Sequence, residues 1–376
     1  MRTRAYEADG KRGTYAGKAT DKRRELNMAA VLRVDRKAIG KNFEIVCNMA
    51  KTQGVQLSVV TKGECGYSWL SDLVQKRGLD SICESRVSAL ERVATEPWLR
   101  EKWLIGSPLL SEVDQSIRLA DVSLNTEMRL VQALATAAQR MGRVHKVVVM
   151  AELGELREGV MAADLVPFCE QVEELPGVVL HGIGTNLSCM NGVLPASANM
   201  IDLTNAVADV ERAVGRKLDV VSLGGSSAVR LLEEANLPAV VNHLRIGEAV
   251  LNGFVPGFDE PLRNGDMGAF VLSGEVVEAR YKPAQAWGEG AGEPHPSSVV
   301  RKRVIVALGY EDTDLRDSYP YDERAVVCGA TSDRTVIDVS DCERDIQVGD
   351  VMRFALGYQA MVRALRAPTV AVIDES

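Results

Sequence analysis

Eight short apolar segments alternate with stretches of helical period between residues 56 and 247, and this alternation constrains the fold more than any other feature of the chain. Apolar segments of strand length, separated by stretches with aliphatic side chains three and four residues apart, indicate βαβ units and a parallel sheet. Eight strands joined by helices over roughly 220 residues predict an α/β fold of the TIM barrel type, a closed (β/α)8 barrel. Because periodicity does not show closure, an open doubly wound sheet is the alternative.

The boundaries of these elements can be estimated from the same pattern. The expected strands are 56–61, 80–84, 102–106, 121–125, 145–152, 178–185, 219–223 and 243–247. Helices are expected at 68–77, 86–95, 112–119, 127–141 and 199–214. The patterned sequence begins at Met28, and Asp35 is well placed to cap a first helix.

The pattern changes after Leu251, where Gly and Pro residues punctuate a loop and no convincing helix follows. Short strands separated by Gly, Pro and Asp turns predict a small β-sandwich or barrel, an all-β domain. Its expected strands are 269–277, 299–308, 325–328, 335–339, 351–356 and 369–373, with 285–298 as an exposed loop. The predicted organisation is a disordered N-terminal extension (1–28), a TIM barrel (29–250) and a C-terminal β-domain (251–376).

Composition and charge exclude several classes of protein. Residues 1–27 carry eight basic and four acidic residues and almost no large aliphatic side chains, so we expect no ordered structure there; a basic arm that binds a partner is the alternative. A net charge of −8 argues against nucleic-acid binding, and no segment approaches the length of a membrane span. Seven cysteines without CxxC spacing indicate free thiols in a reducing cytoplasm, and four scattered histidines indicate no metal site.

Lys62 follows the first expected barrel strand, at the position where a barrel places its chemistry. A lysine held there and partly desolvated has a lowered pKa, so that its free amine attacks an aldehyde; an ordinary solvated lysine is the alternative. Gly-rich backbone with Ser226 and Ser227 follows strand seven and favours a phosphate, or else a plain capped turn. Lysine on strand one and phosphate after strands seven and eight together indicate pyridoxal phosphate.

Two further strand ends carry polar groups. The loop after strand five presents Arg157, whose planar guanidinium suits a substrate carboxylate, although a surface arginine is the simpler interpretation. Small residues at the end of strand six let a flat ring approach Asn186, which is suited to lie against the ring or bond its phenolic oxygen.

With these residues in place, the chain resembles the alanine racemase superfamily of pyridoxal phosphate enzymes, and most of all its alanine/ornithine racemase-like branch. The resemblance covers residues 30–373 and is carried, in order, by the segments 59–62, 121–125, 153–160, 182–187, 244–249 and 348–350. It implies that Lys62 is the Schiff-base lysine and the base for one face of the substrate. Arg245 falls where the superfamily directs an arginine at the pyridine nitrogen, which stays neutral because a guanidinium keeps its proton.

The resemblance also assigns the remaining cofactor and substrate contacts. The phosphate contacts that it implies are Ser226, Ser227, Gly247 and, from the second domain, Tyr358, for which a packed aromatic is the alternative. Arg157 matches the arginine beside the carboxylate. The sequence departs from alanine racemases at Gly66, Met150 and Asn186, where they carry a tyrosine, in some cases a modified lysine, and a histidine.

The second base is the main departure. The superfamily supplies a tyrosine from the partner subunit in a Gly-Tyr-Gly-like turn, and residues 286–290 here read Ala-Trp-Gly-Glu-Gly. Glu289 is therefore the positional candidate for the second base, with Tyr310 or a water as alternatives. Asp312 and Asp333 fall in segments that line the partner's site, where an acid would hold a distal ammonium; solvated turn acids are the simpler interpretation.

The sequence therefore predicts a cytoplasmic, homodimeric amino-acid racemase that uses pyridoxal phosphate, with active sites at the subunit interface. The expected substrate is a small or basic amino acid, ornithine first and then lysine or alanine. One alternative is a basic amino-acid decarboxylase, although those relatives carry a cysteine where this chain has Gly329. A non-catalytic protein that binds pyridoxal phosphate is the other.

Overall fold

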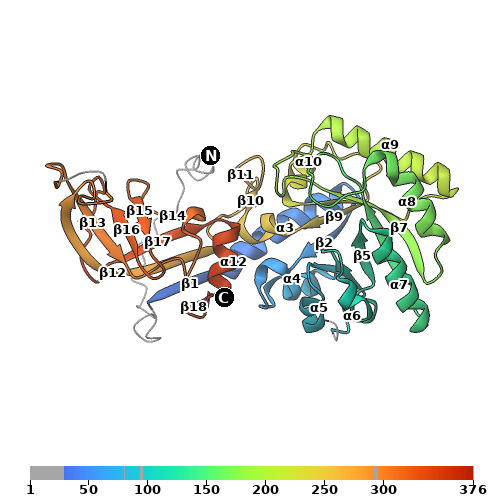
Figure 1. The fold of residues 1–376 in the computed structure, drawn as a ribbon, viewed down its shortest axis with the longest axis horizontal. Helices are drawn as coiled ribbons and strands as arrows, with labels where there is room; N and C mark the ends of the chain where they lie inside the picture. Colours follow the sequence, from blue (N-terminus) through green and yellow to red (C-terminus); the bar gives the residue numbers. More distant parts are fainter. Residues whose placement is uncertain (1–28, 80, 94–95, 292–294, 376) are drawn as a thin grey trace. The chain divides into compact units, whose positions relative to one another are not determined.

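The computed structural model describes residues 29–79, 81–93, 96–291 and 295–375, so the predicted N-terminal extension lies outside the described residues. The chain divides into two compact units (Figure 1). The first is formed by Ile39–Asp266, and the second by residues 29–38 together with 267–375.

The first unit contains a closed barrel of eight parallel strands that neighbour one another in sequence order. The barrel closes because the last strand pairs in parallel with the first, from Gln56 opposite His243 to Val59 opposite Ile246. The predicted TIM barrel is thus confirmed, and the open sheet is excluded. Its strands are β2 (Gln56–Val60), β3 (Ser81–Glu84), β4 (Glu101–Leu104), β5 (Val122–Asn125), β6 (His145–Met150), β7 (Val178–Asn186), β8 (Val220–Gly224) and β9 (His243–Ile246).

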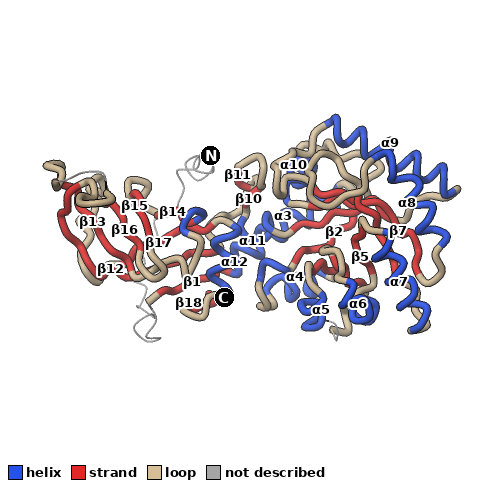
Figure 2. The backbone as a smooth tube through the Cα atoms, viewed as in Figure 1, coloured by secondary structure: helices blue, strands red, loops and turns tan. Residues whose placement is uncertain are grey.

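Helices surround these strands on the outside (Figure 2). Five of them occupy the predicted segments. Asp35 caps α3, the first helix of the described residues, because its Oδ1 accepts hydrogen bonds from the backbone N of Lys37 at 2.8 Å and of Ala38 at 3.1 Å. The helices are α3 (Arg36–Thr52), α4 (Trp69–Arg77), α5 (Val87–Val93), α6 (Val113–Leu119), α7 (Met128–Arg140), α8 (Ala162–Glu174), α9 (Ser197–Val214), α10 (Val229–Glu233) and α11 (Glu248–Asn252).

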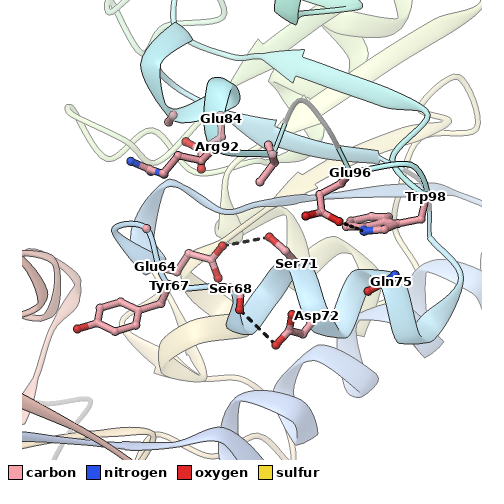
Figure 3. A pocket seen from close by; sticks show the side chains of 13 residues that line it. Glu64, Tyr67, Ser68, Ser71, Asp72, Gln75, Glu84, Arg92, Glu96 and Trp98 are labelled. Atoms are coloured by element: carbon pink, nitrogen blue, oxygen red, sulfur yellow. Dashed lines mark hydrogen bonds between the residues drawn. The ribbon is translucent and has the colours of Figure 1, made fainter.

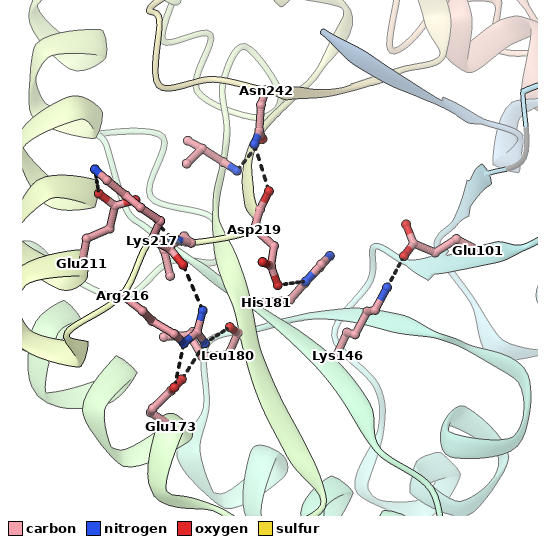
Figure 4. Close-up of polar contacts among 12 residues, drawn as sticks. Glu101, Lys146, Glu173, Leu180, His181, Glu211, Arg216, Lys217, Asp219 and Asn242 are labelled. Atoms are coloured by element: carbon pink, nitrogen blue, oxygen red, sulfur yellow. Dashed lines mark hydrogen bonds and ion pairs between the residues drawn. The ribbon is translucent and has the colours of Figure 1, made fainter.

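The barrel contains a buried apolar cluster, and charged pairs lie at its N-terminal end. One buried cluster draws side chains from six strands, which brings them together inside the barrel: Val60, Cys83, Trp103, Val122, Leu124, Val148, Met150 and Val220. At the N-terminal ends of the strands, Lys146 Nζ lies 2.6 Å from Glu101 Oε1, and His181 Nδ1 lies 3.1 Å from Asp219 Oδ2 (Figure 4). These pairs lie at the opposite end of the strands from Lys62, where barrels keep their stabilising contacts.

The second unit is built on a mainly antiparallel sheet, as predicted. Its main path runs in the order β14-β17-β12-β13-β16-β15, and β1 pairs with both β12 and β18. These strands are β1 (Ala30–Asp35), β12 (Phe270–Pro283), β13 (Val300–Val306), β14 (Ser318–Pro320), β15 (Val326–Ala330), β16 (Thr335–Asp338), β17 (Val351–Leu356) and β18 (Val370–Glu375).

Two features of this unit differ from the predicted organisation. Residues 30–35 were expected within the barrel domain, but β1 lies antiparallel to β12 and parallel to β18, so it belongs to the second sheet. The unit also contains a helix, α12 (Tyr358–Arg366), which packs Ala360, Met361, Ala364 and Leu365 inward. That spacing of three and four residues is the helical signal that the sequence analysis passed over.

Candidate active site

The barrel residues predicted for the site all lie at the C-terminal ends of the strands. Lys62 follows β2, and Asn186 ends β7. Ser226 and Ser227 follow β8 in the short 3₁₀-helix η3 (Ser226–Ala228), and Arg245 is the third residue of β9. Because β7, β8, β9 and β2 are neighbours in the barrel, these groups gather on one part of its rim.

The backbone next to Lys62 is hydrogen-bonded to the neighbouring strand β3. It begins the 3₁₀-helix η1 (Lys62–Glu64), and its side chain is exposed rather than partly desolvated as the sequence analysis expected. The residue before it, Thr61, donates from its backbone N to Cys83 O at 3.0 Å and from Oγ1 to Glu84 Oε1 at 2.7 Å. The lysine is therefore presented from a fixed point with its amine accessible.

Two buried carboxyl groups lie beside this lysine, and the sequence analysis missed both. Glu64 accepts from Leu70 N at 2.7 Å and from Ser71 Oγ at 3.3 Å, and burial raises the pKa of Glu64 to about 8. Burial also raises the pKa of Glu84, against the smaller effects of its hydrogen bond to Thr61 and of the charge on Lys62. Both carboxyl groups line a cavity of about 150 Å³ (Figure 3).

Arg245 is the most deeply buried charged group at the rim, with 2% of its surface exposed. Its Nη2 donates to Asn186 Oδ1 at 2.7 Å and to Thr185 O at 3.1 Å, and its Nη1 donates to Ser222 Oγ. Burial lowers the pKa of Arg245 to about 10, so the guanidinium keeps its proton at neutral pH. Three hydrogen bonds leave two of its five N–H groups for other acceptors.

Gly224 makes the approach of Arg245 and Asn186 possible. A Cβ at this position would overlap both Arg245 Nη2 and Asn186 Oδ1, and a Cβ at nearby Gly184 would lie 2.9 Å from Met150 Sδ. With glycine at position 224, the guanidinium of Arg245 and the amide of Asn186 pack directly against the backbone of β8. We call the surface formed by Gly184, Asn186, Gly224 and Arg245 the cradle.

The loops after β8 and β9 form the next part of the site. Ser226 Oγ accepts from Ala249 N at 2.9 Å, which joins the two loops and leaves the hydroxyl hydrogen to donate elsewhere. Gly225 has φ of 105°, and a Cβ there would lie 2.8 Å from Leu187 O. Gly247 lies against β2, because its Cβ would approach Val60 Cβ at 3.0 Å. Hydroxyls and close-packed backbone of this kind suit a phosphate group.

Arg157 lies in the loop after β6 and is already paired. Its Nε and Nη2 donate to Glu158 Oε2 and Oε1, each at 2.5 Å, and its Nη1 lies 2.6 Å from Cys189 Sγ. The residue before it, Leu156, has φ of 51°, in the left-handed region that favours glycine. Arg157 is close enough for its charge to lower the pKa of Arg245, although less than burial does.

Glu155 fixes this loop against the loop after β7, and the sequence analysis gave it no role. Its Oε1 accepts from the backbone N of Cys189 at 3.0 Å, Met190 at 2.5 Å and Asn191 at 2.7 Å, and its Oε2 accepts from Val193 N at 3.1 Å. Burial raises the pKa of Glu155, but these four N–H groups together outweigh burial and bring the pKa below its ordinary value.

Two of the predicted residues in the second unit have defined structural surroundings. Tyr358 is half-buried and begins α12, whose next two backbone N groups donate to Asp317 Oδ2 at 2.9 and 3.3 Å. Asp312 is buried and accepts from Gly309 N at 2.8 Å, so its carboxylate stabilises its own turn.

The other three predicted residues of this unit are accessible. Asp333 is exposed and lies 2.9 Å from the Nη1 of its neighbour Arg334. Glu289 and Tyr310 are exposed as well. Accessible groups of this kind are free to meet a molecule from solution, whereas Asp312 is not.

Among the described residues, no three His, Cys, Asp or Glu side chains lie close enough together to hold a metal ion. No helix in the described part of the chain has the length and hydropathy needed to cross a bilayer.

Comparison with known proteins identifies the family. Residues 34–253 match the family described as "Alanine racemase, N-terminal domain". An ornithine racemase of Acetoanaerobium sticklandii is 30% identical over 337 residues, which cover 88% of this chain and 95% of that protein. A lysine racemase of Thermotoga maritima is 29% identical over 350 residues, which cover 92% of this chain and 98% of that protein.

A solved structure shares the fold at lower identity. The alanine racemase of Bartonella henselae, with covalently bound pyridoxal phosphate, matches with a TM-score of 0.70 at 14% identity, over 92% of this chain and 99% of that one. The resemblance predicted from the sequence motifs is thus confirmed over both units. The chain therefore belongs to the alanine racemase family, and its enzyme class is that of a racemase.

Proposed function

We propose that this protein interconverts the L- and D-forms of an amino acid with pyridoxal 5'-phosphate bound at the rim of the barrel. The observation that carries the proposal is the gathering of Lys62, Arg245, Asn186 and the Ser226 loop on four neighbouring strands. The cradle above Gly224 suits the ring, and the loops holding Ser226, Ser227 and Gly247 suit the phosphate. Tyr358 is a further phosphate contact in this proposal.

The bound cofactor supplies a covalent link to the amino group and an electron sink for the charge that develops at Cα. Lys62 would hold the cofactor through its amine and would then take or return the Cα proton on one face of the substrate. Arg245 would donate a hydrogen bond to the ring nitrogen and, because a guanidinium keeps its proton, would leave that nitrogen neutral. A neutral ring nitrogen would make the cofactor a weaker electron sink, which would suit racemisation.

Arg157 binds the substrate carboxylate in this proposal. Its guanidinium is engaged by Glu158 in the structure, so the substrate carboxylate has to replace Glu158 as its partner. Glu155 keeps the loop in place during this exchange, since its carboxylate accepts hydrogen bonds from four backbone N groups of the neighbouring loop.

The opposite face of the substrate requires a second base. Glu289 is our candidate for it, supplied by the partner subunit of a homodimer, and Tyr310 or a water is the alternative. For a distal ammonium, exposed Asp333 is better suited than Asp312, whose carboxylate is buried against Gly309 N. Ornithine is our first substrate, followed by lysine and alanine, and the two relatives near 30% identity support a basic amino acid. We propose that the enzyme acts in the cytoplasm.

The proposal is tested by offering L-ornithine, L-lysine, L-alanine and L-serine in heavy water to the protein with pyridoxal phosphate. We expect the D-enantiomer with deuterium at Cα, in wild type and in the control Lys51→Ala, which changes an exposed lysine at the end of α3. Lys62→Ala should abolish both the formation of the D-enantiomer and the incorporation of deuterium at Cα. Exchange without inversion would contradict the two-base mechanism. Carbon dioxide release would instead indicate a decarboxylase, and binding without exchange would indicate a carrier of the cofactor.

A further inference from the structure

We propose that His243 is a positioning residue for Arg245: its neutral imidazole, protonated at Nε2, orients the hydroxyl of Ser222 so that an oxygen lone pair faces the guanidinium. The inference deepens the proposed function, on which its catalytic consequence rests. Neither the sequence motifs nor the comparisons assign a role to His243 or Ser222.

The two residues belong to a continuous chain of hydrogen bonds through the barrel. Ser58 Oγ lies 2.8 Å from His243 Nε2, and His243 Nδ1 lies 2.7 Å from Ser222 Oγ, which in turn accepts from Arg245 Nη1. Ser58 and Ser222 have no exposed surface, and His243 is 2% exposed. Trp103 stacks on the imidazole, with ring centroids 4.3 Å apart and planes 13° from parallel.

The donor and acceptor of each hydrogen bond in this series follow from Arg245, the charged group at its end. A guanidinium is only a donor, so Ser222 Oγ must accept from Arg245. The buried hydroxyl hydrogen of Ser222 then needs an acceptor, and among the described residues the only one within hydrogen-bond distance is His243 Nδ1. Nδ1 is therefore unprotonated, and Nε2 carries the hydrogen and donates it to Ser58 Oγ.

The charges around His243 keep the ring neutral. Burial is the largest effect and brings the pKa of His243 well below its ordinary value, and the nearby Arg245 and His181 lower it further. Protonation of Nδ1 would also turn it into a donor, so that the hydroxyl of Ser222 would lose its acceptor. The neutral imidazole and the charged guanidinium are thus compatible only in this one arrangement of hydrogens.

This arrangement of hydrogen bonds fixes the position of the N–H groups of Arg245 that remain available to a ligand. Ser222 of β8 and Thr185 and Asn186 of the neighbouring β7 hold the guanidinium in place, and its two remaining N–H groups determine where a ring nitrogen can accept a hydrogen bond. Without an acceptor at Nδ1, the hydroxyl of Ser222 is free to turn its hydrogen towards Arg245, and this would displace the guanidinium.

The first experiment needs no cofactor. Ring ¹⁵N resonances of the full chain, with histidine labelled, should show one imidazole in the Nε2–H form that stays neutral from pH 8 down to pH 5.5 and is lost in His243→Phe. If that variant fails to fold, the signal is assigned by elimination with single Gln variants of His145, His181 and His295. If the His243 ring were in the Nδ1–H form, or were charged at pH 6, the proposal would be overturned, whether or not the protein binds pyridoxal phosphate.

The second experiment measures the affinity for pyridoxal phosphate by titration. Ser222→Ala and His243→Phe should each weaken it about 10- to 100-fold, the effect of one hydrogen bond to a charged group. His243→Asn keeps an acceptor near the position of Nδ1 and should restore most of the affinity.

The chain offers a matched control in Ser123→Ala. Ser123 Oγ lies 2.8 Å from His145 Nε2 in an equally buried serine–histidine pair with no hydrogen bond to Arg245. We expect less than a twofold change for this variant. Equal losses in Ser222→Ala and Ser123→Ala would show a merely structural role for His243. Failure of the wild type to bind the cofactor would instead contradict the proposed function.

Discussion

Arg157 is paired with its own neighbour in the sequence: two nitrogens of its guanidinium lie 2.5 Å from the two carboxylate oxygens of Glu158. A third nitrogen contacts Cys189 Sγ at 2.6 Å. The arginine is therefore held in the bidentate geometry that a substrate carboxylate would use, so Glu158 competes with the substrate carboxylate for Arg157.

Removing that competitor should favour substrate binding. Glu158→Gln is expected to lower KM about two- to fivefold with kcat unchanged, because a partly exposed ion pair contributes only about 0.2–1 kcal/mol. Steady-state racemisation kinetics measure the effect, with Glu170→Gln on the exposed side of α8 as control. A raised KM would mean that Glu158 orients Arg157 for the substrate rather than competing with it.

Glu155 should contribute to stability in a way that depends on pH. Its pKa is lowered in the folded state, so its contribution is present above the unfolded value near 4.5 and is lost as pH falls through the folded value. At pH 7, Glu155→Gln should lower the free energy of unfolding by about 1.5–3 kcal/mol, as expected for hydrogen bonds to a charged group. Urea unfolding from pH 7 to pH 3 should show that the difference in free energy of unfolding between wild type and Glu155→Gln shrinks, whereas the control Glu174→Gln should match wild type throughout. A difference that is constant with pH would contradict the role of the Glu155 charge.

Glu64 should make the stability of the protein depend on pH in the opposite direction to Glu155. Its pKa is raised to about 8, so its stabilising contribution is fully present below the unfolded value near 4.5 and is lost as pH rises through 8. Glu64→Gln, which mimics the protonated acid, should become more stable than wild type at pH 9, by on the order of 5 kcal/mol at most. Unfolding at pH 5 and pH 9 measures this, with exposed Glu91→Gln as control. Equal losses of stability in wild type and Glu64→Gln would show that Glu64 is not the titrating group.

Gly224 should be essential for the cofactor cradle. Gly224→Ala places a methyl group against Arg245 and Asn186 and should weaken binding of pyridoxal phosphate about tenfold or more. Gly329→Ala is the matched control, because Gly329 lies in a strand with open space around the added Cβ and is not among the residues with positive φ. Binding is measured by titration on variants with wild-type circular dichroism. Unchanged affinity in Gly224→Ala would place the ring elsewhere.

The local pattern of the sequence was sufficient to predict the barrel. Each of its eight strands is a short apolar segment between helical stretches, and such patterns depend only on neighbours in the sequence. Lys62, Arg245 and Ser226 were placed by the same strand ends together with the family resemblance. Barrel closure was not visible in the pattern, because it depends on the pairing of the first strand with the last, from Gln56 opposite His243 onward.

Long-range contacts could not be predicted in this way. The pairing of β1 with β12 and β18 joins residues far apart in the sequence, so residues 30–35 looked like the start of the barrel domain. The role of Glu155 depends on four backbone N groups more than 30 residues away. His243 looked like an isolated histidine because Ser58 and Ser222 come from other strands. Period and spacing carry no information about such partners.

Chemical reduction tests most directly whether Lys62 holds pyridoxal phosphate. The purified protein is treated with borohydride in the presence of pyridoxal phosphate, digested and analysed by mass spectrometry. We expect one pyridoxyl group, on the peptide that contains Lys62, and its absence in Lys62→Ala but not in Lys51→Ala. Stoichiometric modification of another lysine, with Lys62 unmodified, would contradict the assignment of Lys62.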